Sequence, residues 1–155
     1  MTPPSPVAAS CLSCHLGPHH NTADMAWPLL LLFIAVYPAS CALWVSQAPE
    51  VHAQEGAAAL LPCSFNASRG APAIGFVTWY RDKVAPGHEV RNETAAFRGR
   101  LAPLASSRFL HQHQAELRIR AARAADAGVY VCRVEVLGLG VATGGGTRLR
   151  VGAPV

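Results

Sequence analysis

The sequence predicts an all-β fold, a sandwich of two antiparallel sheets bridged by one disulfide. The run from Asp126 to Cys132 places Asp, Gly, Tyr and Cys at alternate positions, and Trp79 lies between Cys132 and a second cysteine, Cys63. The two cysteines can bridge the sheets through the core, where the indole of Trp79 can pack against them. Tyr130 can send its hydroxyl back to upstream backbone as a tyrosine corner.

The composition fits one secreted domain with a basic surface. The 155 residues are 51% hydrophobic, which is ample for a single core, and the net charge is +4. Such a charge attracts anionic surfaces such as sulfated glycans weakly, and no feature indicates nucleic-acid binding. We divide the chain into a disordered leader or alternative start (1–24), a signal peptide (25–42), the domain (43–151) and a C-terminal tail (152–155).

The signal peptide is predicted from an apolar run that is too short to span a bilayer. Leu29 to Val36 is unbroken and apolar, and the small residues Ser40 and Ala42 follow at positions that a signal peptidase recognises. Removal of residues 1–42 reduces five cysteines to Cys63 and Cys132. An even pair in a secreted chain favours one disulfide.

The metal-like motifs are interpreted as incidental, and we expect no cofactor and no metal. Cys11 to His15 spells a c-type haem attachment pattern, and His19 and His20 follow it. This segment precedes the predicted cleavage site and has no apolar periodicity around it. His111 and His113 could ligate a metal, but no third ligand is apparent nearby, which favours a solvated turn.

Alternating apolar residues predict the strands in chain order. Ala59, Leu61, Cys63 and Phe65 share one parity and should face the core. A kink is expected at Pro49, and Pro62 is awkward for a central strand. We expect a helical turn over 121–125, and strands over 43–47, 51–55, 59–65, 75–81, 88–91, 107–110, 115–120, 128–136 and 144–151.

Several apolar residues are predicted to face outward. In 75–81 the parity that places Val77 and Trp79 inside leaves Phe76, Thr78 and Tyr80 outside. Exposed aromatic side chains on a sandwich usually serve a partner surface. The outward parity of 128–136 offers Val131, Arg133 and Glu135, and we expect an unusually apolar loop over 137–141.

Two sequons and one ion pair complete the residue-level predictions. Asn66 and Asn92 each begin an Asn-x-Ser/Thr sequence, which predicts N-glycosylation in a secreted chain. Arg100 is expected to form a salt bridge with Asp126 across the lower end of the sandwich.

These residues resemble those of a variable-type immunoglobulin domain. The matching positions are Cys63, Trp79, Gly99 to Leu101, Asp126 to Cys132, and Gly144 to Val151, in the order that the family requires. Longer blocks resemble the activating receptors of natural killer cells, and these blocks are 25–27, 41–47, 97–110 and 132–140.

The resemblance implies a receptor ectodomain at the plasma membrane. It would recognise a cell-surface ligand of the costimulatory-ligand family on tumour or stressed cells, and trigger cytotoxicity through immunoreceptor adaptor chains if a transmembrane form exists. No apolar span of membrane length follows the domain, so a secreted form is also expected. The ligand-binding positions that the resemblance implies are Ile74, Phe76, Val77, Phe109, Leu110, Glu135, Val136, Leu137 and Gly138.

Two alternatives compete with this hypothesis. The same fold could serve homophilic adhesion or bind sulfated glycans through its 13 basic residues, and salt would then weaken association. An enzyme is not expected, because the sequence offers no nucleophile and base with a local signature, no phosphate loop and no paired carboxylates.

Overall fold

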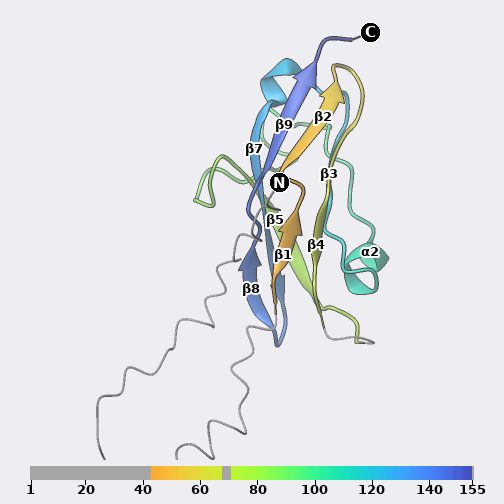
Figure 1. Cartoon of the computed structure of the whole chain (residues 1–155), viewed down its shortest axis with the longest axis vertical. Helices are drawn as coiled ribbons and strands as arrows, with labels where there is room; N and C mark the ends of the chain where they lie inside the picture. Colours follow the sequence, from red (N-terminus) through yellow and green to blue (C-terminus); the bar gives the residue numbers. More distant parts are fainter. Residues whose placement is uncertain (1–42, 68–70, 155) are drawn as a thin grey trace, which may run out of the picture.

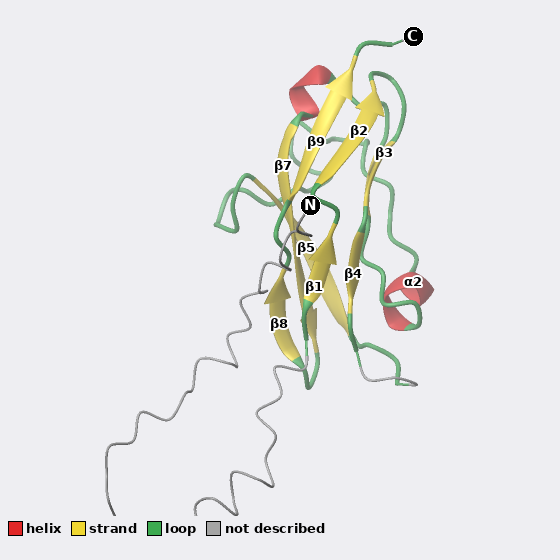
Figure 2. Ribbon diagram, in the orientation of Figure 1, coloured by secondary structure: helices red, strands yellow, loops and turns green. Residues whose placement is uncertain are grey.

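The computed structural model describes residues 43–67 and 71–154, which form a two-layer β-sandwich (Figure 1). Nearly all of its regular structure is strand (Figure 2). The elements in chain order are β1 Val45–Gln47, β2 Glu50–Gln54, β3 Ala59–Leu61, β4 Cys63–Phe65, β5 Gly75–Arg81, α2 Ser106–Leu110, β6 Leu117–Ile119, the 3-10 turn η2 Ala124–Asp126, β7 Gly128–Val136, β8 Gly140–Thr143 and β9 Thr147–Gly152.

The front sheet has the strand order β2-β9-β7-β5, and β8 adds to one end of β7. The long strand β7 pairs antiparallel with β5, and Trp79 is the register partner of Cys132. Strand β2 runs parallel to β9, so this predicted antiparallel sheet contains one parallel pair. The reason is the kink at Pro49, where the chain passes from β1, which pairs with β4, to the front sheet.

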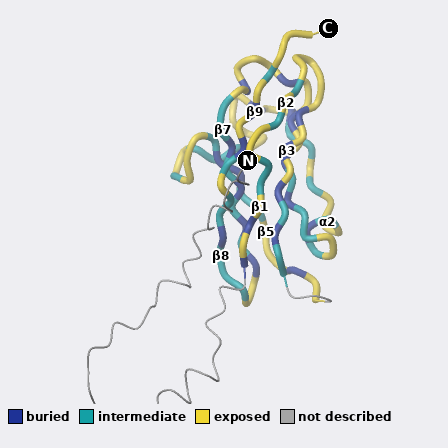
Figure 3. The backbone as a smooth tube through the Cα atoms, viewed as in Figure 1, coloured by how far each residue is buried: buried dark blue, intermediate teal, exposed yellow. Residues whose placement is uncertain are grey.

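The back layer is split at Pro62. Strand β3 pairs with β6, whereas β4 pairs with β1, and Pro62 separates β3 from β4. Proline has no backbone N–H to contribute to a ladder, so an exchange of partners at this residue is expected. The predicted inward parity of the 59–65 segment is confirmed, since the four residues at its inward positions are all buried: Ala59, Leu61, Cys63 and Phe65 (Figure 3).

The core contains the predicted constellation. Cys63 and Cys132 form a disulfide between the two layers. Trp79 is buried and donates from its indole nitrogen to the carbonyl of Ala115 at 2.9 Å. The hydroxyl of Tyr130 donates to the carbonyl of Asp126 at 2.6 Å, which is the predicted tyrosine corner.

A buried ion pair closes the end of the sandwich where η2 leads into β7. The guanidinium of Arg100 donates to both carboxylate oxygens of Asp126, and the backbone N–H of Arg123 donates to the same carboxylate at 2.8 Å. Burial alone would raise the pKa of Asp126, but the hydrogen bond from Arg100 and the one from Arg123 outweigh it. The pKa therefore lies below its ordinary value of 3.8. The predicted salt bridge is confirmed.

Two predicted strands are wrong. Residues 107–110 lie in helix α2, of which only Phe109 is buried, and its ring packs tilted against that of Phe65, with the ring centres 4.8 Å apart. Arg108 points away and pairs with Glu116, so the segment lacks the alternation of a strand. The predicted edge strand over 88–91 is reduced to a single bridge between Tyr80 and Glu89.

Two further predictions need correction at the front sheet. The apolar loop predicted over 137–141 ends earlier, because strand β8 begins at Gly140 and pairs back onto β7. The turn is tight, and Gly138 has a φ of +83°, a conformation that favours glycine. Tyr80 was expected to be exposed, but it is buried between its register partner Val131 and the bridge to Glu89.

The predicted leader and signal peptide, including Cys11, Cys14 and Cys41, lie outside the described residues. Within the described ranges, no helix combines the length and apolar character needed to cross a membrane.

Candidate binding surface

Large apolar side chains gather at one end of the front sheet. Ile74, Phe76 and Leu137 are 57%, 56% and 77% exposed. Ile74 and Phe76 flank the start of β5, and Leu137 follows the last residue of β7. With the half-buried Glu135, these residues form what we call the outer patch. An exposed apolar cluster of this kind usually marks an interaction site.

The pairing of β5 with β7 positions the outer patch. The N–H of Leu137 donates to the carbonyl of Ile74 at 2.7 Å, and Phe76 is the register partner of Glu135. Facing partners on one sheet surface lie close enough to act together. Gly75 permits this approach, because a Cβ at that position would lie 1.8 Å from the carbonyl oxygen of Glu135.

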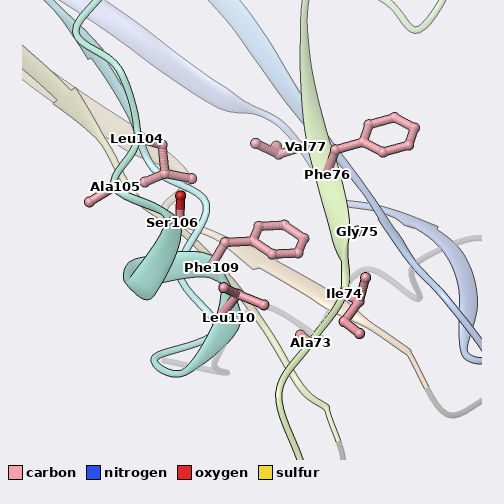
Figure 4. Close-up of a pocket in the computed structure, with 10 residues that line it drawn as sticks. All are labelled: Ala73, Ile74, Gly75, Phe76, Val77, Leu104, Ala105, Ser106, Phe109 and Leu110. Carbon is pink, nitrogen blue, oxygen red and sulfur yellow. The ribbon is translucent and has the colours of Figure 1, made fainter.

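A pocket of about 390 Å³ opens between β5 and α2. Figure 4 shows Phe109 pointing from α2 toward β5, while Val77 and Phe76 leave β5 on opposite sides. The lining carries no charged side chain, and the hydroxyl of Ser106 is its one side-chain polar group. The lining residues are Ala73, Ile74, Gly75, Phe76, Val77, Leu104, Ala105, Ser106, Phe109 and Leu110.

The structure divides the nine ligand-binding residues that were predicted into two groups. Ile74, Phe76, Glu135 and Leu137 form the outer patch, and Gly138 shapes the turn beside it. The remaining four are buried or half-buried, and they support the surface from beneath or line the pocket: Val77, Phe109, Leu110 and Val136. Phe109 and Val136 are only 6% and 4% exposed, so most of their contacts lie inside the domain.

The side chains at this end of the sheet are suited to apolar contact with a partner. Glu135 is the single charged member of the outer patch, and the pocket is apolar. Burial of apolar area against a partner would drive association at about 25 cal/mol per Å² before the costs of binding. Among residues 43–67 and 71–154, no three potential metal ligands gather, and His113 lies against the ring of Phe65 at 5.4 Å.

Gln47 is an important residue that the sequence analysis missed. Its side-chain oxygen accepts from the N–H groups of Cys132 and Gly146 at 3.1 and 3.0 Å. Its side-chain nitrogen donates to the carbonyl of Tyr130 and the hydroxyl of Thr147. The available signal was a polar residue at the end of an alternating strand, just before the Pro49 kink, which is too common a pattern to single it out.

The side-chain oxygens of both predicted glycosylation asparagines accept hydrogen bonds from the backbone. The side-chain oxygen of Asn66 accepts from the N–H of Trp44 at 2.6 Å, and Ser68 of this sequon lies outside the described residues. Asn92 is exposed, and its side-chain oxygen accepts from the N–H of Leu101 at 3.4 Å.

The sandwich, its disulfide and the tyrosine corner define the class of protein. The sequence profile of the Immunoglobulin V-set domain matches residues 46–152. The chain therefore belongs to the V-set immunoglobulin family.

Within this family, the chain is similar to several named receptors. Over 127 residues the chain is 72% identical to "Natural cytotoxicity triggering receptor 3" of both Homo sapiens and Pan troglodytes, which covers 82% of this chain and 63% of each relative. It is 62% identical over 127 residues to the receptor of the same name from Rattus norvegicus, covering 82% of this chain and 66% of the relative. The matched part is thus less than two thirds of these three relatives.

Proposed function

We propose that the chain is the ligand-binding ectodomain of an activating receptor of natural killer cells. It recognises a cell-surface protein of the costimulatory-ligand family on tumour or stressed cells. The outer patch, with its three large exposed apolar residues on the front sheet, is the observation that carries this proposal. The similarity to natural cytotoxicity triggering receptors supports the cell type and the role in cytotoxicity.

The chain acts in this proposal as a binding module and not as an enzyme. Its contribution is to present apolar anchors on a sheet that the disulfide and the buried Arg100–Asp126 pair make rigid. Anchors of this kind dominate binding energy when a partner excludes water from them. Signalling belongs to immunoreceptor adaptor chains that pair with a transmembrane form at the plasma membrane. A secreted form would keep the same binding surface and compete for the ligand.

The test is a reporter assay with a matched pair of variants. The domain, fused to a signalling tail, is displayed on reporter cells and exposed to cells that each carry one costimulatory-family protein. At least one such protein should activate the reporter. Leu137→Glu should abolish activation, because a charge in the middle of an apolar contact must be desolvated without a partner. Trp44→Glu changes another exposed apolar residue, which is 53% exposed and lies just before β1, and it should leave activation intact.

Two outcomes would contradict the proposal. If activation survives the Leu137→Glu substitution, the outer patch is not part of the ligand-binding site. Binding that occurs equally on all cells and disappears with added salt would instead favour attachment to sulfated glycans.

A further inference from the structure

Alternate residues of β5 direct their backbone groups away from β7. At one end of this pairing the N–H of Asp82 donates to the carbonyl of Val129 at 2.8 Å, and at the other end Leu137 donates to Ile74 at 2.7 Å. Both pairs fit the register of the ladder, in which even-numbered residues of β5 exchange hydrogen bonds with β7. The N–H and C=O groups of Gly75 and Val77 therefore point to the opposite edge.

On that opposite edge, the backbone groups of β5 are hydrogen-bonded only near its C-terminal end. The N–H of Val90 donates to the carbonyl of Trp79 at 2.8 Å, and the N–H of Arg81 donates to His88 at 2.8 Å. The segment around His88 to Val90 then leaves the sheet, because its only bridge to β5 is the one between Tyr80 and Glu89. In the described part of the chain, no strand pairs with Gly75 or Val77 on this edge.

The pocket opens beside this uncovered edge. Residues 75–77 of β5 form one wall and the Leu104 to Leu110 segment forms the other. One end is closed where the N–H of Ala73 donates to the carbonyl of Leu110 at 2.9 Å. Figure 4 shows the ring of Phe109 reaching across this space toward β5. The result is a short apolar groove with a line of backbone donors and acceptors along one side.

We propose that this groove binds an extended apolar segment of a partner protein, which adds to β5 as a further strand of the front sheet. Donor and acceptor groups that recur every second residue complement an extended backbone, whereas a helix has used its own backbone groups internally. The uncharged lining accepts apolar side chains of that segment and offers no counter-charge to an ionic one. The inference rests on the proposed function, since Ile74 and Phe76 belong both to the outer patch and to the lining of the groove, and it specifies how the ligand is held.

A pair of substitutions at Val77 separates the backbone contact from the side-chain contact. Val77→Ala and Val77→Pro both remove the valine side chain, but only proline also removes the outward N–H. Proline is tolerated where the N–H faces away from the ladder, so both variants should fold. Binding to ligand-bearing cells should be about tenfold weaker for Val77→Pro than for Val77→Ala, which corresponds to about 1.4 kcal/mol for the lost backbone contact.

Amide exchange in the unsubstituted chain provides a test that does not depend on folding of a variant. The probe is an acetylated and amidated peptide in which leucine and threonine alternate. Its length of about six residues is typical of a strand. The Val77 N–H should exchange rapidly in the free chain and become protected when the peptide is added. The neighbouring Phe76 and Thr78 amides, which bond to β7, should be protected in both states.

Two N-methylated versions of the peptide sharpen this test. One carries methyl groups on the leucine amides and the other on the threonine amides, so only one version loses the donors that face β5. One version should bind at least about tenfold more weakly than the other. Equal binding by both versions, or no saturable protection of Val77 by the unmethylated peptide at about millimolar concentration, would overturn strand addition.

Failure of this inference can be distinguished from failure of the proposed function. If Val77→Pro binds ligand-bearing cells as well as Val77→Ala does, while Leu137→Glu abolishes binding, the receptor function stands and strand addition is wrong. If Val77→Pro binds as well as Val77→Ala does, and Leu137→Glu does not weaken binding, then both strand addition and the proposed function are wrong. Concentration-dependent dimers that Val77→Pro abolishes would assign the groove to a second copy of this chain and would overturn the partner proposed here.

Discussion

The guanidinium of Arg81 lies 5.8 Å from the centre of the Tyr130 ring, and it donates to the carbonyls of Ala125 and Ala127. One arginine at the end of β5 thus holds both the aromatic residue of the tyrosine corner and the turn that precedes β7. Cation–π contacts of this kind contribute about 0.5–1 kcal/mol where they are partly exposed. Ionisable groups therefore fix the end of the domain where β7 begins, and the stability of the domain should depend on pH.

The first prediction concerns alkaline pH. Burial raises the pKa of Tyr130 from 10.0 to about 12. Because the folded state favours the neutral phenol, Tyr130 contributes to the stability of the domain. This contribution is complete below pH 10.0, the pKa of Tyr130 in the unfolded chain, and is lost as pH rises from 10.0 toward about 12. Denaturant unfolding measured across that window should show the loss. Tyr130→Phe should be less stable at neutral pH, by about 1 kcal/mol for the lost hydrogen bond, but should show a shallower alkaline slope. Equal slopes would contradict the assignment.

The second prediction concerns acid. The pKa of Asp126 is lowered, so its contribution is present above the ordinary value of 3.8 and is lost as pH falls through the lower folded value. Arg100→Met leaves the buried carboxylate without its partner and should cost about 3–5 kcal/mol at pH 7. The cost should shrink in acid, where the carboxylate can be protonated. A cost that is independent of pH would mean that Arg100 acts through packing alone.

The third prediction concerns Gln47. Gln47→Ala removes the partner of the Cys132 and Gly146 N–H groups and should destabilise the domain by about 2–4 kcal/mol. Ser46→Ala, at the exposed neighbouring position of β1, should stay within about 0.5 kcal/mol of the original chain. Thermal and denaturant unfolding of the two variants would decide the matter. Similar values for both would show that water replaces the glutamine without cost.

The fourth prediction separates surface anchors from buried support. Leu137→Ala and Phe76→Ala should each weaken ligand binding by more than about 1 kcal/mol and leave the unfolding midpoint nearly unchanged. Phe109→Ala should instead destabilise the fold by about 3–5 kcal/mol, because its ring is buried against that of Phe65. Binding kinetics and unfolding curves of the same preparations test both parts. Near-zero binding effects at Leu137 and Phe76 would exclude the outer patch.

The fifth prediction concerns the close approach of β5 and β7. Gly75→Ala places a methyl group where only 1.8 Å separates it from the Glu135 carbonyl oxygen, so the strands must move apart. Both stability and ligand binding should fall, since the outer patch spans this junction. Gly152→Ala is the matched control, because its Cβ would meet only Ala53 at 4.0 Å. If both variants behave alike in unfolding and binding assays, the close approach has no functional importance.

The sequence was sufficient for the parts of the fold that depend on fixed spacing and alternation. Cys63, Trp79, Tyr130 and Cys132 occupy the expected core, and the bounds of β7 agree with the prediction. It was insufficient where a local pattern was ambiguous. Phe109 and Leu110 are adjacent apolar residues, which fit a short helix as well as a strand, and tertiary packing on Phe65 decided between them.

The candidate site was predictable only in part, for a similar reason. Parity identified Phe76 and Glu135 as outward residues, but it also placed Tyr80 outside, where the neighbouring bridge buries it. The resemblance grouped Phe109 and Val136 with residues that are far more exposed. Which apolar residues reach the surface depends on where neighbouring segments leave the sheet, and no single-strand pattern contains that information.

Strand β7 separates two tasks along its length. Its first residues adjoin the tyrosine corner and the buried ion pair, and its last residue leads into the Leu137 turn. Sequence changes in that turn can therefore alter the choice of ligand while the elements that resist unfolding remain untouched. An engineer who wishes to redirect this domain should randomise Leu137 and keep Gly138, Leu139 and Gly128 to Cys132 unchanged.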